Sequence, residues 1–360
     1  MPNPFQEAGP VRGDAFCDRD VELERVLESI ERGGGVLVEG AGGAGTSSFL
    51  LRIRDRLVER GWTVPVMDLW RADGASAVAD ELAAATVELA TDRKTDATTE
   101  HPSGGGEEGL EAALDALRER AGASDRRVAL VVDEADRVKE IDDDVAALES
   151  LLELSTARTS GGERVAVVLG GGELGSDLET SLGSSGTAEP LRVRLGPIPF
   201  EAWLPFVLER FLVTDRWIEN RHVERIFQIT QGHPARTQAV LHALWDQVER
   251  NTGTQDGEVD RAVKVAVRRR GQGYALLWRT LTRNQRRVLR GLALDGPGAR
   301  PYSSAFIRRH RLASPSSAQR ALQALEDLRV VTRTDDEGPR IEDLFLRRWL
   351  RERSSAGSNA

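Results

Sequence analysis

The N-terminal half of the chain alternates short apolar runs with amphipathic stretches, and this alternation restricts the folds that are open to it. Each apolar run is bounded by glycine or charge and is short enough for a buried strand, while the stretches between the runs repeat their apolar side chains at helical spacing. Apolar strands that alternate with helices predict an α/β fold in which helices cover both faces of a parallel sheet. The predicted strands lie within residues 35–40, 62–70, 127–136 and 163–172, and the predicted helices are residues 18–35, 47–61, 76–90 and 144–158.

A glycine-rich loop follows the first predicted strand, in the sequence VEGAGGAGTSS (38–48). Its spacing matches the phosphate-binding pattern G-x-x-x-x-G-K-[ST], with Gly40 and Gly45 as the glycines and Ser47 as the last residue. Glycines let a phosphate reach several backbone N–H groups, and the following helix directs its positive end toward the anion. We therefore predict nucleotide contacts from Gly40, Ala41, Gly42, Gly43, Ala44, Gly45, Thr46, Ser47 and Ser48.

Two acids end the third apolar run, VALVVDEAD (128–136). In P-loop enzymes an aspartate at this strand end holds Mg2+, and a glutamate after it orients the attacking water. Asp133 and Glu134 occupy these positions, and Ser47 supplies a second Mg2+ ligand. An acidic loop after a buried strand is the purely structural alternative. The order and spacing of the loop and the acids predict a P-loop NTPase core.

The lysine of the phosphate-binding pattern is absent, because Thr46 stands in its place. A hydrogen bond to a charged group contributes about 1.5–3 kcal/mol, so this change weakens nucleotide binding by roughly 10- to 150-fold. Hydrolysis should suffer more, since charge on the transferred phosphoryl group must be stabilised in the transition state. Arg52 is a candidate to replace the lysine. The sequence thus predicts weak binding of ATP or ADP, with Mg2+ when nucleotide is bound.

The strand pattern stops after the turn GPIP (196–199), and helical patterns follow. Residues 275–353 have the order of a winged helix-turn-helix, in which Ser314 caps a helix that starts at Pro315 and has an apolar stripe ending at Leu328. The opposite face of that helix is polar and suits base edges and phosphates. The acidic wing tip, residues 335–337, favours the alternative of a winged helix that contacts protein. The predicted DNA contacts are Ser316, Ser317, Gln319, Arg320, Gln323, Arg308, Arg309 and Arg311.

The net charge of −9 is unevenly distributed along the chain. Residues 261–311 hold fourteen Lys or Arg and one acid, Asp295, so the remaining residues carry about −22. This asymmetry indicates a polyanion partner for the basic segment, or an arginine-rich surface that is solvated or paired with the acidic part of the chain.

The motifs FCDRDVELERV, VLVEGAGGAGTSSFL, ALVVDEAD and TQGHPARTQAV, in this order, resemble the archaeal-type ATPases, STAND-like relatives of the AAA+ and origin-recognition ATPases. The resemblance implies an NTPase core at 12–196, a helical lid at 197–272 and a winged helix at 275–353.

The resemblance also implies roles for single residues. Phe16 and Arg19 lie where the related proteins approach the nucleotide base, although Asp18 replaces the usual glycine, and Pro234 lies where their lid approaches the nucleotide. The polar residue that senses the γ-phosphate in the relatives is replaced here by glycines at 170–172.

Taken together, the sequence predicts a DNA-binding switch or regulator with duplex DNA as its partner and with impaired or absent ATP hydrolysis. A scaffold that binds a protein partner or itself is the main alternative, and an active ATPase with an unusual loop is the weaker one. The single cysteine and the lack of a long apolar stretch indicate a cytoplasmic protein without a membrane partner. Residues 92–108 are predicted to form a mobile insertion.

Overall fold

The computed structural model describes residues 2–72, 75–91, 107–122, 127–137, 151, 165–172, 174, 189–296, 298–334 and 338–356. The chain divides into two compact units. The sheet unit comprises Ala8–Trp203 with His233–Ala235, and the helical unit comprises Met1–Glu7, Leu204–Gly232 and Arg236–Ala360. Each unit is described by itself.

A five-stranded parallel sheet forms the centre of the sheet unit, as predicted. Its strand order is β2-β3-β4-β1-β5, so β4 separates the strand that precedes the glycine-rich loop from the strand that ends in the two acids. The sequence did not predict β5. The strands are β1 (Val36–Gly40), β2 (Val66–Asp68), β3 (Ala129–Asp133), β4 (Ala166–Gly171) and β5 (Leu191–Leu195).

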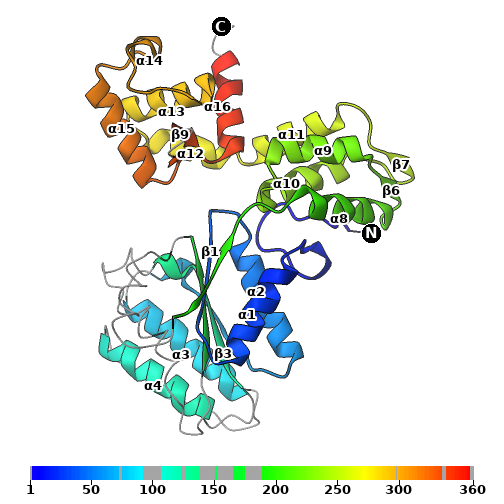
Figure 1. Cartoon of the computed structure of the whole chain (residues 1–360), viewed down its shortest axis with the longest axis vertical. Helices are drawn as coiled ribbons and strands as arrows, with labels where there is room; N and C mark the ends of the chain where they lie inside the picture. The colour runs from blue at the N-terminus through cyan, green and yellow to red at the C-terminus, as the bar shows by residue number, and fades with distance from the viewer. Residues whose placement is uncertain are drawn as a thin grey trace. The chain divides into compact units, whose positions relative to one another are not determined.

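Helices cover both faces of this sheet (Figure 1). Helices α1 (Asp20–Glu31) and α2 (Thr46–Glu59) pack on one face, and α3 (Ala75–Thr91) and α4 (Glu107–Gly122) pack on the other. Successive strand residues enter opposite cores, which explains why the strands are apolar throughout: Val36 and Val38 join the core under α1 and α2, whereas Leu37 joins the core under α3 and α4.

Two predicted segments fall largely outside the described residues. Of the predicted insertion 92–108, only the last two residues are described, and they are helical because α4 begins at Glu107. The predicted helix 144–158 also lies outside the described residues, except for the buried Leu151.

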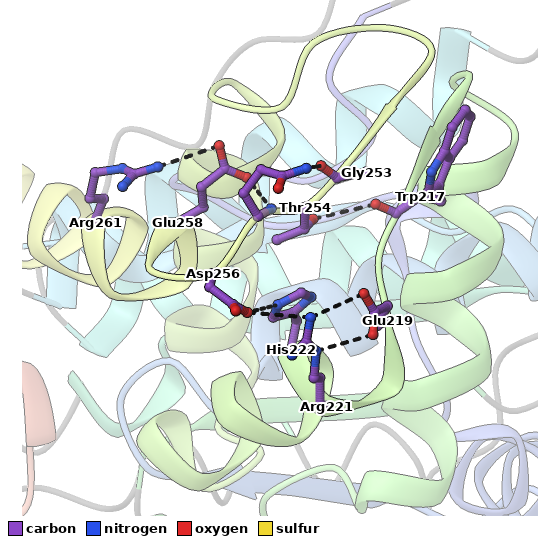
Figure 2. Close-up of polar contacts among 10 residues, drawn as sticks. Trp217, Glu219, Arg221, His222, Gly253, Thr254, Asp256, Glu258 and Arg261 are labelled. Atoms are coloured by element: carbon purple, nitrogen blue, oxygen red, sulfur yellow. Dashed lines mark hydrogen bonds and ion pairs between the residues drawn. The ribbon is translucent and has the colours of Figure 1, made fainter.

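The first part of the helical unit corresponds to the predicted lid and contains several helices. A short parallel ribbon joins them, so the prediction that strands end at residue 199 was wrong. Figure 2 shows the ribbon: the Thr254 N–H donates to the Trp217 carbonyl at 2.9 Å, and the Asp256 carboxylate meets His222 at 3.5 Å and Arg221 at 3.3 Å. These elements are α8 (Phe200–Leu212), β6 (Arg216–Trp217), α9 (Asn220–Thr230), α10 (Pro234–Trp245), β7 (Thr252–Gly253) and α11 (Glu258–Arg269).

The second part of the helical unit is a winged helix, as predicted. Strands β8 and β9 form the antiparallel wing, and its acidic tip, Asp335, Asp336 and Glu337, lies outside the described residues. The module comprises α12 (Gly271–Thr280), α13 (Arg283–Asp295), α14 (Ser304–Arg309), α15 (Pro315–Asp327), β8 (Val331–Thr334), β9 (Gly338–Ile341) and α16 (Leu344–Ala356).

Asp343 fastens the start of α16 to the rest of the helical unit. Its carboxylate accepts hydrogen bonds from the Phe345 N–H at 2.9 Å and the Tyr274 hydroxyl at 2.7 Å, and it forms an ion pair with the buried Arg236 of α10 at 3.3 Å. The winged helix is therefore joined to the predicted lid by a charged, hydrogen-bonded contact as well as by the chain itself.

No described helix is long and apolar enough to cross a membrane.

Candidate nucleotide site

The glycine-rich loop runs from β1 into α2 and leaves backbone donors unused. Gly43 and Gly45 adopt φ values of 80° and 96°, which residues with a side chain rarely visit. Gly45 takes the N-cap position of α2 without a capping side chain. Among the residues that the structure describes, none accepts a hydrogen bond from the N–H groups of Gly43, Gly45 or Thr46. A run of free N–H groups at a helix start is a binding site for an anion.

Gly40 and Thr46 are packed against each other at the base of the loop. A Cβ atom at Gly40 would lie 2.8 Å from the Thr46 hydroxyl oxygen and 2.9 Å from the Ala44 Cβ. The first pattern glycine is therefore needed for close packing. Thr46, which replaces the lysine, turns its side chain toward Gly40 at the end of β1. A threonine is uncharged, so it brings no positive charge to the loop.

Ser47, in the first turn of α2, lies beside Asp133, the last residue of β3. The Ser47 hydroxyl donates a hydrogen bond to the Asp133 carboxylate. Burial, and secondarily the nearby Asp68 and Asp136, raises the pKa of Asp133 above its usual value. A buried carboxylate of this kind gains from a cation. Mg2+ keeps several waters and needs one or two protein ligands, so Ser47 and Asp133 fit it, although no group of three or more metal-ligating side chains occurs among the described residues.

Glu134 follows directly in a strained conformation. Its φ of 56° is left-handed, and its N–H donates to the Asp133 side chain at 3.0 Å. Burial first, and then the charge of Asp133, raises the pKa of Glu134. Strained non-glycine residues are often found at functional sites.

Glu39 precedes the loop and fixes its strand to the sheet edge. The side chain is buried, forms ion pairs with Arg192 and Arg194 of β5, and accepts a hydrogen bond from the Leu174 N–H at 3.1 Å. Burial opposes the charge of Glu39, but the hydrogen bonds from Arg192 and Leu174 outweigh it and lower the pKa of Glu39. The sequence analysis did not identify this buried charge below the loop.

The segment His233–Ala235 contacts the outer side of the loop. The His233 Nε2 lies 3.1 Å from the Gly42 carbonyl oxygen, and the Ala235 N–H donates to the Gly43 carbonyl at 3.2 Å. A Cβ atom at Gly43 would lie 2.9 Å from the His233 ring. The structure thus brings the predicted Pro234, the first residue of α10, to the glycine-rich loop.

Two residues that are predicted to contact the nucleotide, Ser48 and Arg19, instead contact other parts of the protein. Ser48 is buried and accepts a hydrogen bond from the Val11 N–H at 3.0 Å. Arg19 is buried, donates to the Gly196 carbonyl, and pairs with Glu22 at 3.0 Å. Both side chains are therefore engaged by the protein itself.

The structure also places Asp18 and Arg52, two residues that the sequence analysis singled out. Asp18 has a φ of 64°, so its position requires the left-handed conformation that glycine prefers and aspartate tolerates. The Arg52 guanidinium lies 5.9 Å over the Phe16 ring, on the face of α2 that it shares with Ser48. The predicted replacement of the lysine by Arg52 therefore gains no support from its placement.

The two glycines that end β4, Gly170 and Gly171, leave room for neighbouring side chains. A Cβ atom at Gly170 would lie 2.4 Å from a Leu50 methyl carbon of α2, and one at Gly171 would lie 2.4 Å from an Asp136 carboxylate oxygen. Asp136 thus occupies the place where a side chain at 171 would begin, a relation that no spacing in the sequence indicates.

The polar face of α15 departs from the prediction at Ser317 and Leu328. Ser317 is 7% exposed, because it forms a capping box with Ser314, so the prediction that it lies on the exposed face was wrong. Leu328 is 54% exposed and does not close the apolar stripe. The predicted contacts that are exposed are Ser316, Gln319, Arg320, Gln323, Arg308, Arg309 and Arg311.

The exposed arginines differ in their partners. Arg309 pairs with Asp295 at 3.1 Å, and the same carboxylate meets His310 at 3.1 Å. Among the described residues, Arg308 and Arg320 have no ion-pair or hydrogen-bond partner for their side chains. Sequence alone could not separate the paired arginine from the free ones.

Two protein-family models match the chain. One, described as an AAA domain, matches residues 30–174, and the other, described as a probable winged helix domain, matches residues 272–352. The chain therefore combines an AAA domain with a winged helix domain. No curated protein matches it significantly.

Solved structures share this fold over nearly the whole chain. A Walker-type ATPase of Pyrococcus abyssi is 17% identical with a TM-score of 0.67, and the match covers 97% of this chain and 99% of that one. The Aeropyrum pernix ORC2 protein, in ADPNP–ADP complexes, is 14% identical with a TM-score of 0.62, covering 95% and 94%. The Aeropyrum pernix ORC1 protein in complex with DNA is 18% identical with a TM-score of 0.54, covering 97% and 96%. These TM-scores show a common fold, and at 14–18% identity the likeness shows the fold alone.

Proposed function

We propose that this protein binds ATP or ADP weakly through the backbone of its glycine-rich loop and acts as a DNA-binding switch or regulator through its winged helix. The observation that carries the nucleotide part is the loop itself. Gly43 and Gly45 hold left-handed conformations, the N–H groups of Gly43, Gly45 and Thr46 have no acceptor among the described residues, and Ser47 and Asp133 lie together beside the loop. Mg2+ bound there would neutralise part of the phosphate charge.

Slow or absent hydrolysis follows from what the loop lacks. Thr46 supplies no positive charge, and no side chain fits at Gly170 or Gly171 to meet the γ-phosphate. Asp133 and Glu134 keep the positions of a Mg2+ ligand and of a residue that orients water. An active ATPase with an unusual loop is the weaker alternative, which the retained Glu134 keeps open.

The DNA part rests on the winged helix and on its charge. Arg308, Arg311 and Arg320 are exposed, and residues 261–311 carry fourteen basic residues against one acid. The structurally similar ORC1 protein of Aeropyrum pernix has been solved in complex with DNA.

A reducing, cytoplasmic location agrees with the single, buried cysteine, Cys17.

Exposed apolar side chains favour a second candidate, a scaffold that binds a protein partner or another copy of itself. Leu328, Leu294 and Tyr302 of the winged helix are 54%, 46% and 42% exposed. Apolar exposure of this kind suits a protein interface better than a DNA backbone.

The two candidates differ in their response to salt. We propose to titrate the full-length protein with labelled duplex DNA from about 50 to 200 mM salt, without nucleotide and with ADP or ATP. DNA binding predicts a logarithm of affinity that falls linearly with the logarithm of salt concentration. A shift on adding nucleotide would identify a responsive switch, and an unchanged line a nucleotide-independent binder. Failure to bind DNA at about 50 mM, where phosphate contacts are strongest, would remove the DNA part and leave the scaffold.

A further inference from the structure

We infer that His233 is a positioning residue for the glycine-rich loop. With Pro234 and Ala235 it forms a clamp, the segment His233–Ala235, that orients loop N–H groups for an anion. The ligand in this inference rests on the proposed nucleotide binding, whereas the orientation of the loop by the clamp does not.

The clamp acts on two successive carbonyl groups. The His233 imidazole donates from Nε2 to the Gly42 carbonyl oxygen at 3.1 Å, and the Ala235 N–H donates to the Gly43 carbonyl oxygen at 3.2 Å. A carbonyl can only accept, so Nε2 must carry the proton in this contact. Both contacts lie within the sheet unit.

Fixing these carbonyls also fixes the N–H groups behind them. In a planar trans peptide the C=O of one residue and the N–H of the next point in opposite directions. The Gly42 carbonyl shares its peptide plane with the Gly43 N–H, which has no acceptor among the described residues. Holding the carbonyl toward His233 therefore turns the Gly43 N–H away from the clamp, where an anion can accept its hydrogen bond.

Such a restraint matters for this loop, because little else in its sequence restricts the backbone conformation. Gly42, Gly43 and Gly45 have wide backbone freedom, and ordering them costs conformational entropy when a ligand binds. The usual lysine is absent, so the loop depends on its N–H groups for affinity. A restraint present before binding reduces the ordering cost and increases affinity.

The fit at Gly43 supports a specific contact over general packing. A Cβ atom there would lie 2.9 Å from the His233 Cε1 and 3.0 Å from the Ala235 Cβ. At Gly42, by contrast, a Cβ atom would meet nothing within 4 Å. The clamp therefore covers one glycine of the loop closely and leaves its neighbour open.

Two variants separate the hydrogen bond from the shape of the ring. His233→Phe keeps an aromatic ring but removes the donor, whereas His233→Gln supplies an amide N–H of similar reach. His242→Phe is the matched control, because His242 lies in α10 and pairs with Asp246 at 3.4 Å. Thermal melting of each full-length variant verifies that it folds.

Hydrogen exchange of the Ala44 amide, which donates to the Ala41 carbonyl within the loop at 2.8 Å, is the decisive readout and needs no nucleotide. We expect His233→Phe to increase exchange of this amide and to weaken ADP binding about three- to tenfold, as for one lost hydrogen bond. His233→Gln and His242→Phe should remain near the wild type in both. Unchanged exchange of the Ala44 amide in His233→Phe, or an equal increase in His233→Gln, would overturn the inference. Absence of ADP binding by the wild type would instead refute the proposed function, while the exchange data would still decide the clamp.

Discussion

Helices α2 and α15 both begin at a predicted binding site, but the backbone N–H groups of their first turns differ in whether they have hydrogen-bond acceptors. Helix α2 starts after Gly45 with no capping side chain, and its first N–H groups have no acceptor among the described residues. Helix α15 starts after Ser314, whose hydroxyl accepts from the Ser317 N–H at 3.2 Å while the Ser317 hydroxyl accepts from the Ser314 N–H at 3.1 Å. The start of α2 is therefore free to bind an anion, whereas the start of α15 is already occupied.

This difference restricts the ways in which the winged helix could contact DNA. A phosphate held by the N-terminal N–H groups of α15 would have to displace the capping box, which stabilises a helix by about 1 kcal/mol. Any DNA contact of α15 must instead come from exposed side chains such as Arg320 and Gln319. One site is thus built from backbone and the other from side chains, and the predictions below test that contrast.

The largest effect is expected below the loop, at the buried Glu39. Glu39→Ala removes the carboxylate of the Glu39–Arg192 ion pair, and breaking a buried pair costs about 3 kcal/mol or more. The pKa of Glu39 is lowered in the folded state, so its stabilising contribution is full above the ordinary pKa of a glutamate and is lost as pH falls through the lowered value. Unfolding free energies at pH 7 and at acid pH should therefore differ between wild type and variant most at pH 7.

An exposed pair provides the control for this prediction. Glu59→Ala removes the partner of Arg56 on the surface of α2, where such pairs contribute about 0–1 kcal/mol. Equal destabilisation by the two variants would contradict the importance of the buried pair for the strand that carries the loop.

The second largest effect is expected on ATP binding, when the positive charge that is missing at Thr46 is restored. Thr46→Lys should strengthen ATP binding by roughly 10- to 150-fold, because the new ammonium group can contact the phosphates. Thr46→Met, which has a long uncharged side chain, is the control and should not strengthen binding. Calorimetric titration measures both, and a gain in the methionine variant equal to that in the lysine variant would mean that charge is not what the loop lacks.

Neighbouring glycines give a sharper test of the backbone site. Gly43→Ala forces a side chain into a left-handed conformation and against His233, which should weaken ADP binding about 5- to 30-fold. Gly42→Ala meets nothing within 4 Å and should bind ADP like the wild type. Similar affinities for the two variants would show that the loop conformation does not determine binding.

The smallest effect is expected on the side-chain site. Arg320→Ala should cost about 1 kcal/mol in DNA affinity, the lower end of the range for an arginine that reads a base edge. Arg309→Ala should cost less, because Asp295 already pairs with Arg309. Fluorescence anisotropy at two salt concentrations measures both, and a larger loss for Arg309 than for Arg320 would contradict the ranking.

Much of the backbone-built site could be predicted from the sequence, whereas the side-chain site could not. The spacing of Gly40, Gly45 and Ser47 reflects chain geometry, so it indicated a glycine-rich turn between a strand and a helix, and Asp133 at the end of a buried strand indicated where the sheet edge lies. Parallel strands and two covered faces followed from the apolar runs. The AAA domain and the winged helix confirm the predicted fold class.

Contacts between residues distant in sequence were missed for a physical reason. Pairing of Arg309 with Asp295 and of Glu39 with Arg192 depends on how elements pack, which local periodicity does not encode. The same holds for His233, whose sequence context, GHP, resembled the lid motif that places Pro234 near the nucleotide but indicated no contact between His233 and the glycine-rich loop. Strand β5 was missed because LRVRL carries charges at alternate positions, as an edge strand does.

The most direct test of the account is a titration of the full-length wild-type protein with labelled ATP, with and without Mg2+, followed by measurement of its turnover. We predict saturable, weak binding that Mg2+ strengthens, with slow or absent hydrolysis, because the loop offers N–H groups, Ser47 and Asp133 but no lysine. Absence of binding in both conditions would contradict the nucleotide site. Rapid hydrolysis that Glu134→Gln abolishes would contradict the claim that Thr46 impairs the enzyme.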